Sequence, residues 1–118
     1  MDKARILVVE DEALIAMMLE DFIETLGHEV AAVVDSVQDG LAAVDKGAFD
    51  LAVLDVNLQG GEASWPIADA LTGAEKPFLF TSGGDLEPPP ERHRERLFLG
   101  KPFTLEGIDE ALKTILAT

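Results

Sequence analysis

Five short apolar runs alternate along this chain with longer segments in which apolar residues recur every three or four positions. Parallel strands buried on both faces are typically continuous apolar runs, whereas a helix on a sheet carries one apolar stripe. The predicted strands cover residues 6–9, 30–34, 50–54, 78–81 and 97–99. Strands and helices that alternate in this way predict an α/β fold, a doubly wound parallel sheet with helices on both faces and right-handed crossovers.

The predicted helices are bordered by residues that commonly begin or end helices. Gly27 and Gly47 follow the first and second helical segments, and glycine readily adopts the left-handed conformation that ends a helix. Ser36, Ser64 and Thr104 precede the second, third and last segments. We expect their hydroxyl groups to cap the N-termini of these helices.

The segment between the fourth and fifth strands is irregular. Pro88 to Pro90 are consecutive, and proline breaks the interior of a helix, so the fourth helix should be short, late or absent. Gly83 and Gly84 follow the fourth strand and allow wide backbone freedom. We therefore expect residues 83–96 to be loosely held and to respond to events at the neighbouring strand ends.

With 118 residues the chain has the usual size of one domain, and we expect a single domain over residues 1–118 with no output domain. No apolar run approaches the roughly 18 residues of a membrane span, and no secretory signal is recognised. The chain has no cysteine, which excludes disulfides and thiol chemistry. A cytoplasmic location is expected.

Acidic residues dominate the charge, with 23 Asp and Glu against 9 Lys and Arg and a net charge of −14. Such a charge repels nucleic acid and anionic lipid, so we expect neither as a partner. The one basic cluster, residues 92–96, is interleaved with glutamate and is interpreted as a solvated loop. His28 and His93 have no second histidine at metal-ligand spacing and are expected at the surface.

Charged and polar residues follow four of the predicted strands. They are Glu10, Asp11 and Glu12 after the first strand, Asp55 and Asn57 after the third, Ser82 after the fourth and Lys101 after the fifth. Ligands of open parallel sheets bind beyond the carboxyl ends of the strands. Singly, these residues could merely favour a helix N-terminus or a turn, but their joint placement predicts one site.

Carboxylates that converge repel one another unless a proton or a cation lies among them. An oxygen-only ligand set that keeps several waters suits Mg²⁺ better than zinc. We predict Asp11 and Asp55 as direct ligands, Glu10 as a ligand directly or through water, and the backbone carbonyl of Asn57 as a further ligand.

The same residues match the needs of phosphoryl transfer, which are a nucleophile, charge neutralisation and orienting donors. Asp55 would be the nucleophile and would form an acyl phosphate. Mg²⁺ and Lys101 would neutralise the phosphoryl oxygens, while the Ser82 hydroxyl and nearby backbone N–H groups would donate hydrogen bonds.

Three motifs resemble those of response regulator receiver domains of two-component systems. They are Ile-Leu-Val-Val-Glu-Asp-Glu (6–12), Leu-Ala-Val-Leu-Asp-Val-Asn-Leu (51–58) and Lys-Pro-Phe (101–103). The resemblance covers nearly the whole chain. It implies the flavodoxin-like sheet order 2-1-3-4-5, Mg²⁺, phosphoryl transfer from a histidine kinase or phosphotransfer protein, a downstream protein target, and a cis peptide before Pro102.

The fourth strand has two adjacent hydroxyl residues. Counting from Pro77, which resembles the proline that opens this strand in the family, places the switch hydroxyl at Ser82 and Thr81 at the usual apolar position. Residues 77–84 resemble an alphaproteobacterial, often single-domain subfamily with Pro-Phe-x-Phe-Ala-Thr-Gly, and the Gln59-Gly60-Gly61 loop fits it. Phe98 replaces a common tyrosine, and Trp65 is expected to pack the third helix.

Three other functions were weighed. A haloacid-dehalogenase-type phosphatase would need an Asp-x-Asp nucleophile motif at the first strand, and a nucleotide-binding module would need glycine-rich phosphate loops, which are both missing there. An adaptor that binds partners without phosphorylation would not need Ser82 and Lys101. The chain is therefore interpreted as a phosphoacceptor signalling protein and not an enzyme with a separate substrate; whether it activates a target or drains phosphoryl groups stays open.

Overall fold

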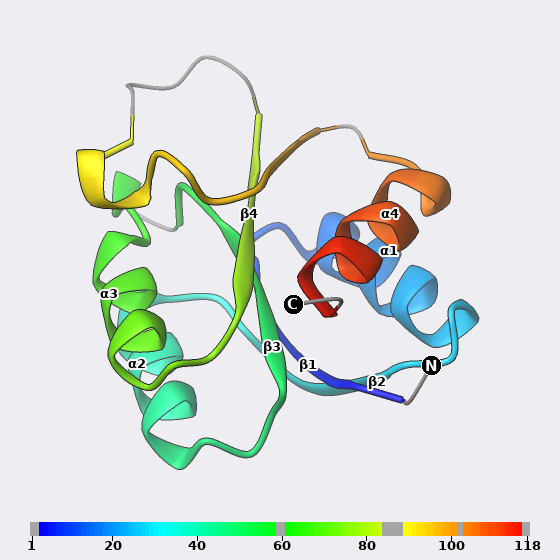
Figure 1. Cartoon of the computed structure of the whole chain (residues 1–118), viewed down its shortest axis with the longest axis horizontal. Coiled ribbons are helices and arrows are strands. Elements are labelled where there is room, and N and C mark those ends of the chain that lie inside the picture. The colour runs from blue at the N-terminus through cyan, green and yellow to red at the C-terminus, as the bar shows by residue number, and fades with distance from the viewer. Residues whose placement is uncertain (1–2, 59–60, 84–88, 102, 117–118) are drawn as a thin grey trace.

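The computed structural model describes residues 3–58, 61–83, 89–101 and 103–116. Within these ranges five strands alternate with four α-helices (Figure 1). The strands are β1 (Arg5–Val9), β2 (Glu29–Val34), β3 (Leu51–Asp55), β4 (Phe78–Ser82) and β5 (Phe98–Gly100). The α-helices are α1 (Ala13–Thr25), α2 (Val37–Lys46), α3 (Trp65–Gly73) and α4 (Leu105–Leu116). The predicted alternation is confirmed, and each strand boundary lies within one residue of its predicted position.

All neighbouring strands run parallel, in the order β2-β1-β3-β4-β5. The predicted fold class and strand order are therefore confirmed. The order reverses between β1 and β3, so the connections from these strands leave toward opposite faces of the sheet. Their carboxyl ends border the crevice in which parallel sheets bind ligands.

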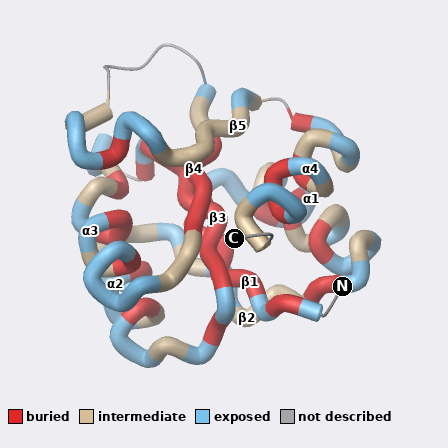
Figure 2. Tube along the Cα trace, in the orientation of Figure 1, coloured by how far each residue is buried: buried red, intermediate tan, exposed pale blue. Residues whose placement is uncertain are grey.

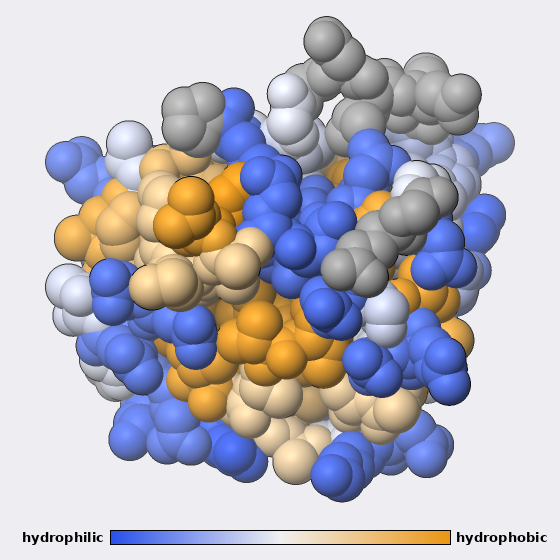
Figure 3. Space-filling model, turned by 180° about the vertical axis from the view of Figure 1, so that it is seen from behind, coloured by the Kyte–Doolittle hydropathy of each residue, from blue (hydrophilic) through white to orange (hydrophobic). Residues whose placement is uncertain are grey.

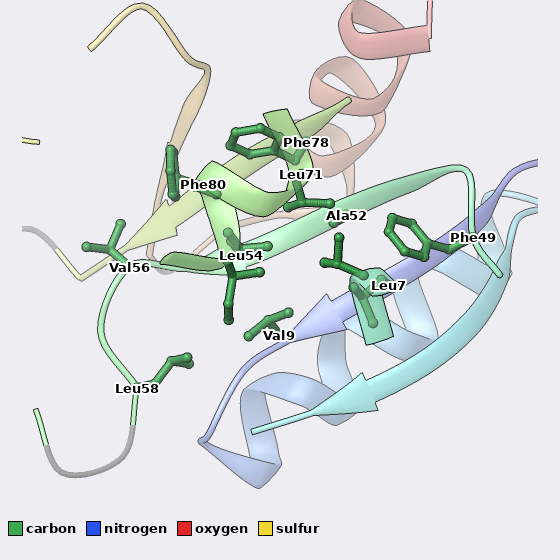
Figure 4. Close-up of a cluster of buried hydrophobic side chains, with 13 residues drawn as sticks. Leu7, Val9, Phe49, Ala52, Leu54, Val56, Leu58, Leu71, Phe78 and Phe80 are labelled. Carbon is green, nitrogen blue, oxygen red and sulfur yellow. The ribbon is translucent and has the colours of Figure 1, made fainter. Parts of the chain in front are cut away.

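Alternate strand residues form two apolar clusters, one on each face of the sheet. The cluster against α2 and α3 includes Leu7, Val9, Ala52, Leu54, Phe78 and Phe80 (Figure 4). The cluster against α1 and α4 includes Ile6, Val8, Leu51, Val53 and Leu79. β1, β3 and most of β4 are buried on both faces, and the tube in Figure 2 shows them as a buried centre. Each fully buried large side chain contributes about 1.5–3 kcal/mol, so these continuous apolar runs hold the site's strands rigidly.

Most of the predicted helix boundaries are confirmed. Oγ of Ser36 accepts a hydrogen bond from the N–H of Asp39, and Oγ1 of Thr104 accepts one from the N–H of Gly107. Gly47 ends α2 in the left-handed conformation, with φ 69°. Ser64 precedes α3, but the predicted side-chain cap is wrong: its buried Oγ has no hydrogen-bond partner in the described part of the chain, and backbone bonds hold the residue instead.

Among the described residues between β4 and β5, the only helical element is a single turn of 3₁₀ helix, η2 (Glu91–His93), which agrees with the expected short fourth helix. Arg92 and His93 both contact Asp69 of α3: Nε of Arg92 lies 2.7 Å and Nε2 of His93 lies 2.8 Å from Oδ1. Arg96 donates to Oγ1 of Thr72 in the same helix. Residues 92, 93 and 96 thus contact α3, which the sequence did not indicate, while the expected mobility of this segment stays a prediction. Residues 84–88, and the expected cis peptide at Pro102, lie outside the described residues.

Both histidines are buried, which corrects the expectation that they lie at the surface. His93 is 1% exposed, because Trp65 stacks on its ring and Phe80 contacts it edge-on. His28 is 6% exposed, and its Nδ1 accepts a hydrogen bond from the N–H of Ala4. Trp65 also packs edge-on against Phe80, which confirms its predicted structural role. No helix in the described ranges is long and apolar enough to cross a bilayer.

Candidate functional site

The residues singled out at the strand ends lie at one edge of the sheet. Glu10 directly follows β1, Asp55 is the last residue of β3, Ser82 is the last residue of β4, and Lys101 directly follows β5. Since all these strands are parallel, their carboxyl ends lie on the same side of the molecule. The N–H of Lys101 donates to the carbonyl of Ser82, 2.8 Å away, which ties the end of β5 to the end of β4.

Lys101 bridges two carboxylates that come from different strands. Its Nζ lies 2.9 Å from Oε1 of Glu10 and 3.2 Å from Oδ2 of Asp55. All three side chains are largely buried, with exposed fractions of 13% for Lys101, 0% for Glu10 and 8% for Asp55. The low-dielectric surroundings strengthen these attractions relative to a surface ion pair. The bridge between Lys101 and Glu10 was not anticipated from the sequence, where Lys101 was expected only to face the phosphoryl group.

Glu10 is the most buried acid of the site. Its Oε2 accepts a hydrogen bond from the N–H of Glu12, 3.1 Å away. Burial raises the pKa of Glu10 above its usual value of 4.5, and the Asp55 carboxylate acts in the same direction, although Lys101 and the Glu12 N–H group oppose them. Glu10 therefore holds its proton more firmly than an exposed glutamate.

Competing effects act on the pKa of Lys101. Burial by itself lowers the pKa of Lys101, but the hydrogen bond to Glu10 and the charge of Asp55 outweigh it and raise the pKa above its usual value of 10.5. Lys101 therefore remains a cation at neutral pH and compensates the acids around it.

Asp11 completes a set of three acids. One carboxylate oxygen from each of Glu10, Asp11 and Asp55 lies within 4.8 Å of the other two. Oxygens that share one Mg²⁺ at about 2.1 Å lie up to about 4.2 Å apart, so little closure is needed to fit this ion. Hard oxygen donors without sulfur or imidazole match Mg²⁺ rather than zinc. The donor set therefore fits the predicted ion.

Asn57, the fourth predicted ligand, lies two residues beyond β3. It forms an isolated antiparallel bridge with Ala63, and its side chain is exposed. The N–H of Ser64 donates to the carbonyl of Val56, so the chain turns back beside the site. The role of the Asn57 carbonyl stays a prediction.

The two hydroxyl residues of β4 lie in different surroundings. Thr81 is fully buried and is paired in register with Asp55, and its Oγ1 has no hydrogen-bond partner among the described residues. Ser82 is partly exposed at the strand end. The role of Ser82 as the switch hydroxyl stays a prediction.

Comparison with known proteins relates the chain to response regulators. The model of the response regulator receiver domain family matches residues 6–63. The transcriptional regulatory protein PcoR of Escherichia coli is 39% identical over 83 residues, which are 69% of this chain and 36% of PcoR. The chain thus spans about a third of that relative.

Two solved structures resemble the chain over nearly its whole length. SdrG from Sphingomonas melonis Fr1 is 49% identical, with a TM-score of 0.88 and coverage of 98% of this chain and 99% of SdrG. SdrG from Pseudomonas melonis Fr1 in its BeF3-activated conformation is 50% identical, with a TM-score of 0.82 and coverage of 95% of both chains.

Proposed function

Since the chain belongs to the response regulator receiver domain family, we propose that it accepts a phosphoryl group on Asp55 in a Mg²⁺-dependent reaction. The observation that carries this proposal is the bridge made by Lys101 between Glu10 and Asp55, beside Asp11. An ordinary ion pair needs one acid. Three acids and one lysine at the ends of a parallel sheet are the groups that phosphoryl transfer requires.

The reacting group is the carboxylate of Asp55. One of its oxygens attacks the phosphorus atom of a phosphohistidine, a P–O bond forms as the P–N bond breaks, and the imidazole leaves and takes up a proton. The product is an acyl phosphate on Asp55. The rigid end of β3, buried on both faces, fixes this oxygen and so reduces the entropic cost of the encounter.

The acids around Asp55 hold the metal. Asp11, Asp55 and Glu10, directly or through water, together with the Asn57 carbonyl, would bind Mg²⁺, which neutralises charge on the phosphoryl oxygens when it is bound. Lys101 adds a second positive charge on the side of β5. It exchanges its present partner Oδ2 of Asp55 for a phosphoryl oxygen, and keeps Glu10 as its anchor.

Ser82 acts after transfer. Its hydroxyl lies at the partly exposed end of β4, from which it would donate a hydrogen bond to a phosphoryl oxygen. The hydrogen bond from the Lys101 N–H to the Ser82 carbonyl couples the ends of β4 and β5. A shift at Ser82 would therefore move the neighbouring β5 as well, and this pair of strand ends would carry the signal.

The donor is a histidine kinase or phosphotransfer protein, and the phosphorylated form either binds a downstream protein or drains phosphoryl groups from a pathway. The BeF3-activated conformation of SdrG, half identical in sequence, supports this proposal because BeF3 complexes imitate a phosphoryl group on a carboxylate.

Phosphoryl uptake from acetyl phosphate tests the proposal. The wild-type protein should gain the mass of one phosphoryl group with Mg²⁺ and none with a chelator, and Asp55→Asn should gain none. Asp45→Asn, an exposed acid of α2 with the same chemical change, is the matched control and should react like the wild type. Uptake by Asp55→Asn at the wild-type rate would refute the proposal.

A further inference from the structure

Five large apolar side chains are exposed in the described residues. They are Leu14, Met17 and Met18 of α1, Val33 of β2 and Leu41 of α2. Leu14 and Met17 are 76% and 60% exposed. β2 is an edge strand, and α1 and α2 flank it on opposite faces of the sheet. Figure 3 shows the molecule from behind, where apolar surface adjoins hydrophilic surface.

A groove of about 400 Å³ lies between α1 and the end of β2. Met17, Val33 and Val34 supply large apolar side chains to its lining, and Glu20, Asp35 and Asp39 supply acids. Glu10 and Asp11 also line it, so the groove begins beside the candidate phosphoacceptor site. The lining of the groove therefore combines apolar side chains with acids, and we call Glu20, Asp35 and Asp39 its acidic rim.

The acids of this rim have no cationic partner in the part of the chain that the structure describes. No lysine or arginine lines the groove, and no ion pair among the described residues includes Glu20, Asp35 or Asp39. Elsewhere acids are paired, such as Asp69 with Arg92 and Asp109 with Lys113. A partner with positive charge would supply what this rim lacks.

We propose that this groove binds a basic, amphipathic segment of a partner protein. Lysine or arginine side chains would lie against Glu20, Asp35 and Asp39, and apolar side chains of the same segment would cover Met17 and Val33. Nucleic acid and anionic membranes lack the positive charge that the rim requires.

A second copy of the chain does not meet these requirements. Each copy carries a net charge of −14, so two copies repel each other. The basic cluster is already engaged within its own chain: Arg92 binds Asp69, Arg94 donates to the carbonyl of Pro89, and Arg96 donates to Thr72. The occupant is therefore a different protein.

A synthetic helical peptide of leucine and lysine is a suitable probe, followed by backbone amide NMR shifts without any phosphodonor. The shifts should concentrate on α1, the end of β2 and the start of α2. A peptide with glutamate in place of lysine should cause none. Because no phosphoryl group is present, the result is independent of the proposed phosphorylation of Asp55.

Two matched pairs of variants distinguish binding in the groove from non-specific attraction to the acidic surface of the protein. Asp35→Asn with Asp39→Asn should weaken binding about tenfold, whereas Glu106→Gln with Glu110→Gln, an equally spaced exposed pair on α4, should change it about twofold at most. Met17→Ser should weaken binding, and the adjacent Met18→Ser, outside the groove, should not.

Equal losses for the two acidic pairs, or shifts spread over the whole acidic surface, would overturn the proposal, as would the absence of binding. Shifts of the same amides that depend on protein concentration without peptide would assign the groove to a second copy instead, and would also overturn it.

Discussion

The ammonium nitrogen of Lys101 lies 3.2 Å from a carboxylate oxygen of Asp55, although Lys101 follows β5, Asp55 ends β3, and β4 lies between these two strands. The same nitrogen reaches Glu10 at the end of β1. Lys101 thus spans the sheet edge and offsets part of the charge of the acids before any metal binds. This relationship links the electrostatics of the site to its stability.

Removing the charge of Lys101 should therefore strengthen metal binding. In Lys101→Met the acids lose their cation, so we expect Mg²⁺ to bind about tenfold more tightly and the metal-free protein to be less stable. Amide NMR titration with Mg²⁺ and thermal unfolding measure the two effects. Lys113→Met, which breaks an exposed pair with Asp109, is the control and should change neither by much. An unchanged Mg²⁺ affinity in Lys101→Met would show that Lys101 does not neutralise the metal site.

Glu10 should make the metal-free protein lose stability as the pH rises. Because the folded-state pKa of Glu10 is raised above 4.5, the folded protein binds more protons than the unfolded chain above that pH. The contribution of Glu10 to the free energy of unfolding is fully present below pH 4.5 and is lost as the pH rises through its folded-state pKa. Lys101 acts at a different pH, since its contribution is lost only above 10.5.

The free energy of unfolding of the wild type relative to Glu10→Gln isolates this effect from that of other acids. We expect this difference to fall as the pH rises above 4.5 without Mg²⁺, and Mg²⁺ to offset the fall. A difference that stays flat or rises with pH above 4.5 contradicts the assignment of Glu10 as the acid disfavoured by burial.

Asp69 fastens η2 to α3. Exposed ion pairs contribute little to the free energy of unfolding. However, Asp69→Asn would weaken, and Asp69→Ala would remove, the hydrogen-bond partner of Nε2 of the buried His93. Nδ1 of His93 already has no hydrogen-bond partner among the described residues. An unpaired buried polar group costs about 1–3 kcal/mol, so Asp69→Ala should destabilise by that amount. Asp109→Ala, which removes an exposed ion pair with Lys113, is the control and should lower the free energy of unfolding by well under half as much. Equal losses of unfolding free energy for the two variants, measured by denaturant unfolding, would contradict the account.

The contribution of Asp69 should depend on pH in the opposite direction to that of Glu10. Arg92 first, and His93 in addition, lower the pKa of Asp69 below 3.8. Its contribution is therefore present above pH 3.8 and is lost as the pH falls through the folded-state value. Because the side chain is half exposed, the effect should be small and should shrink at high salt.

Gly40 of α2 packs against Ile67 of α3, and a Cβ atom at this position would overlap Cδ1 of Ile67. Gly40→Ala should destabilise by about 1 kcal/mol or more, although alanine is the better helix former. Ile67→Val removes the overlapping atom, so the double variant should cost less than the sum of the two single changes. Gly73→Ala, where a Cβ meets nothing within 4 Å, should not destabilise. Strict additivity of Gly40→Ala and Ile67→Val would contradict this packing.

The fold was predictable because its signals are local. Continuous apolar runs marked every strand, and Ser36, Gly47 and Thr104 marked helix ends through hydrogen bonds and backbone conformations within a few residues. The prediction that the Ser64 side chain caps α3 was wrong, because Ser64 is buried and is held by backbone hydrogen bonds. Its burial depends on the packing of α3 and not on the residues beside Ser64 in the sequence.

The site was predictable in its members but not in its internal pairing. Strand ends place Glu10, Asp55 and Lys101 at one edge, but the bridge between Lys101 and Glu10 joins two strands that are not neighbours. The burial of His93 likewise depends on Trp65, which lies far from it in the sequence. Such contacts leave no local pattern in a single sequence.

The position of the phosphoryl group is the most direct test of the central claim that Asp55 is the sole acceptor. The protein is treated with acetyl phosphate and Mg²⁺, and reduction with borohydride then converts an aspartyl phosphate to homoserine, which peptide mass spectrometry locates. We predict homoserine at residue 55 alone, lost when Mg²⁺ is chelated. Homoserine at Asp11 or at any other aspartate would contradict the account.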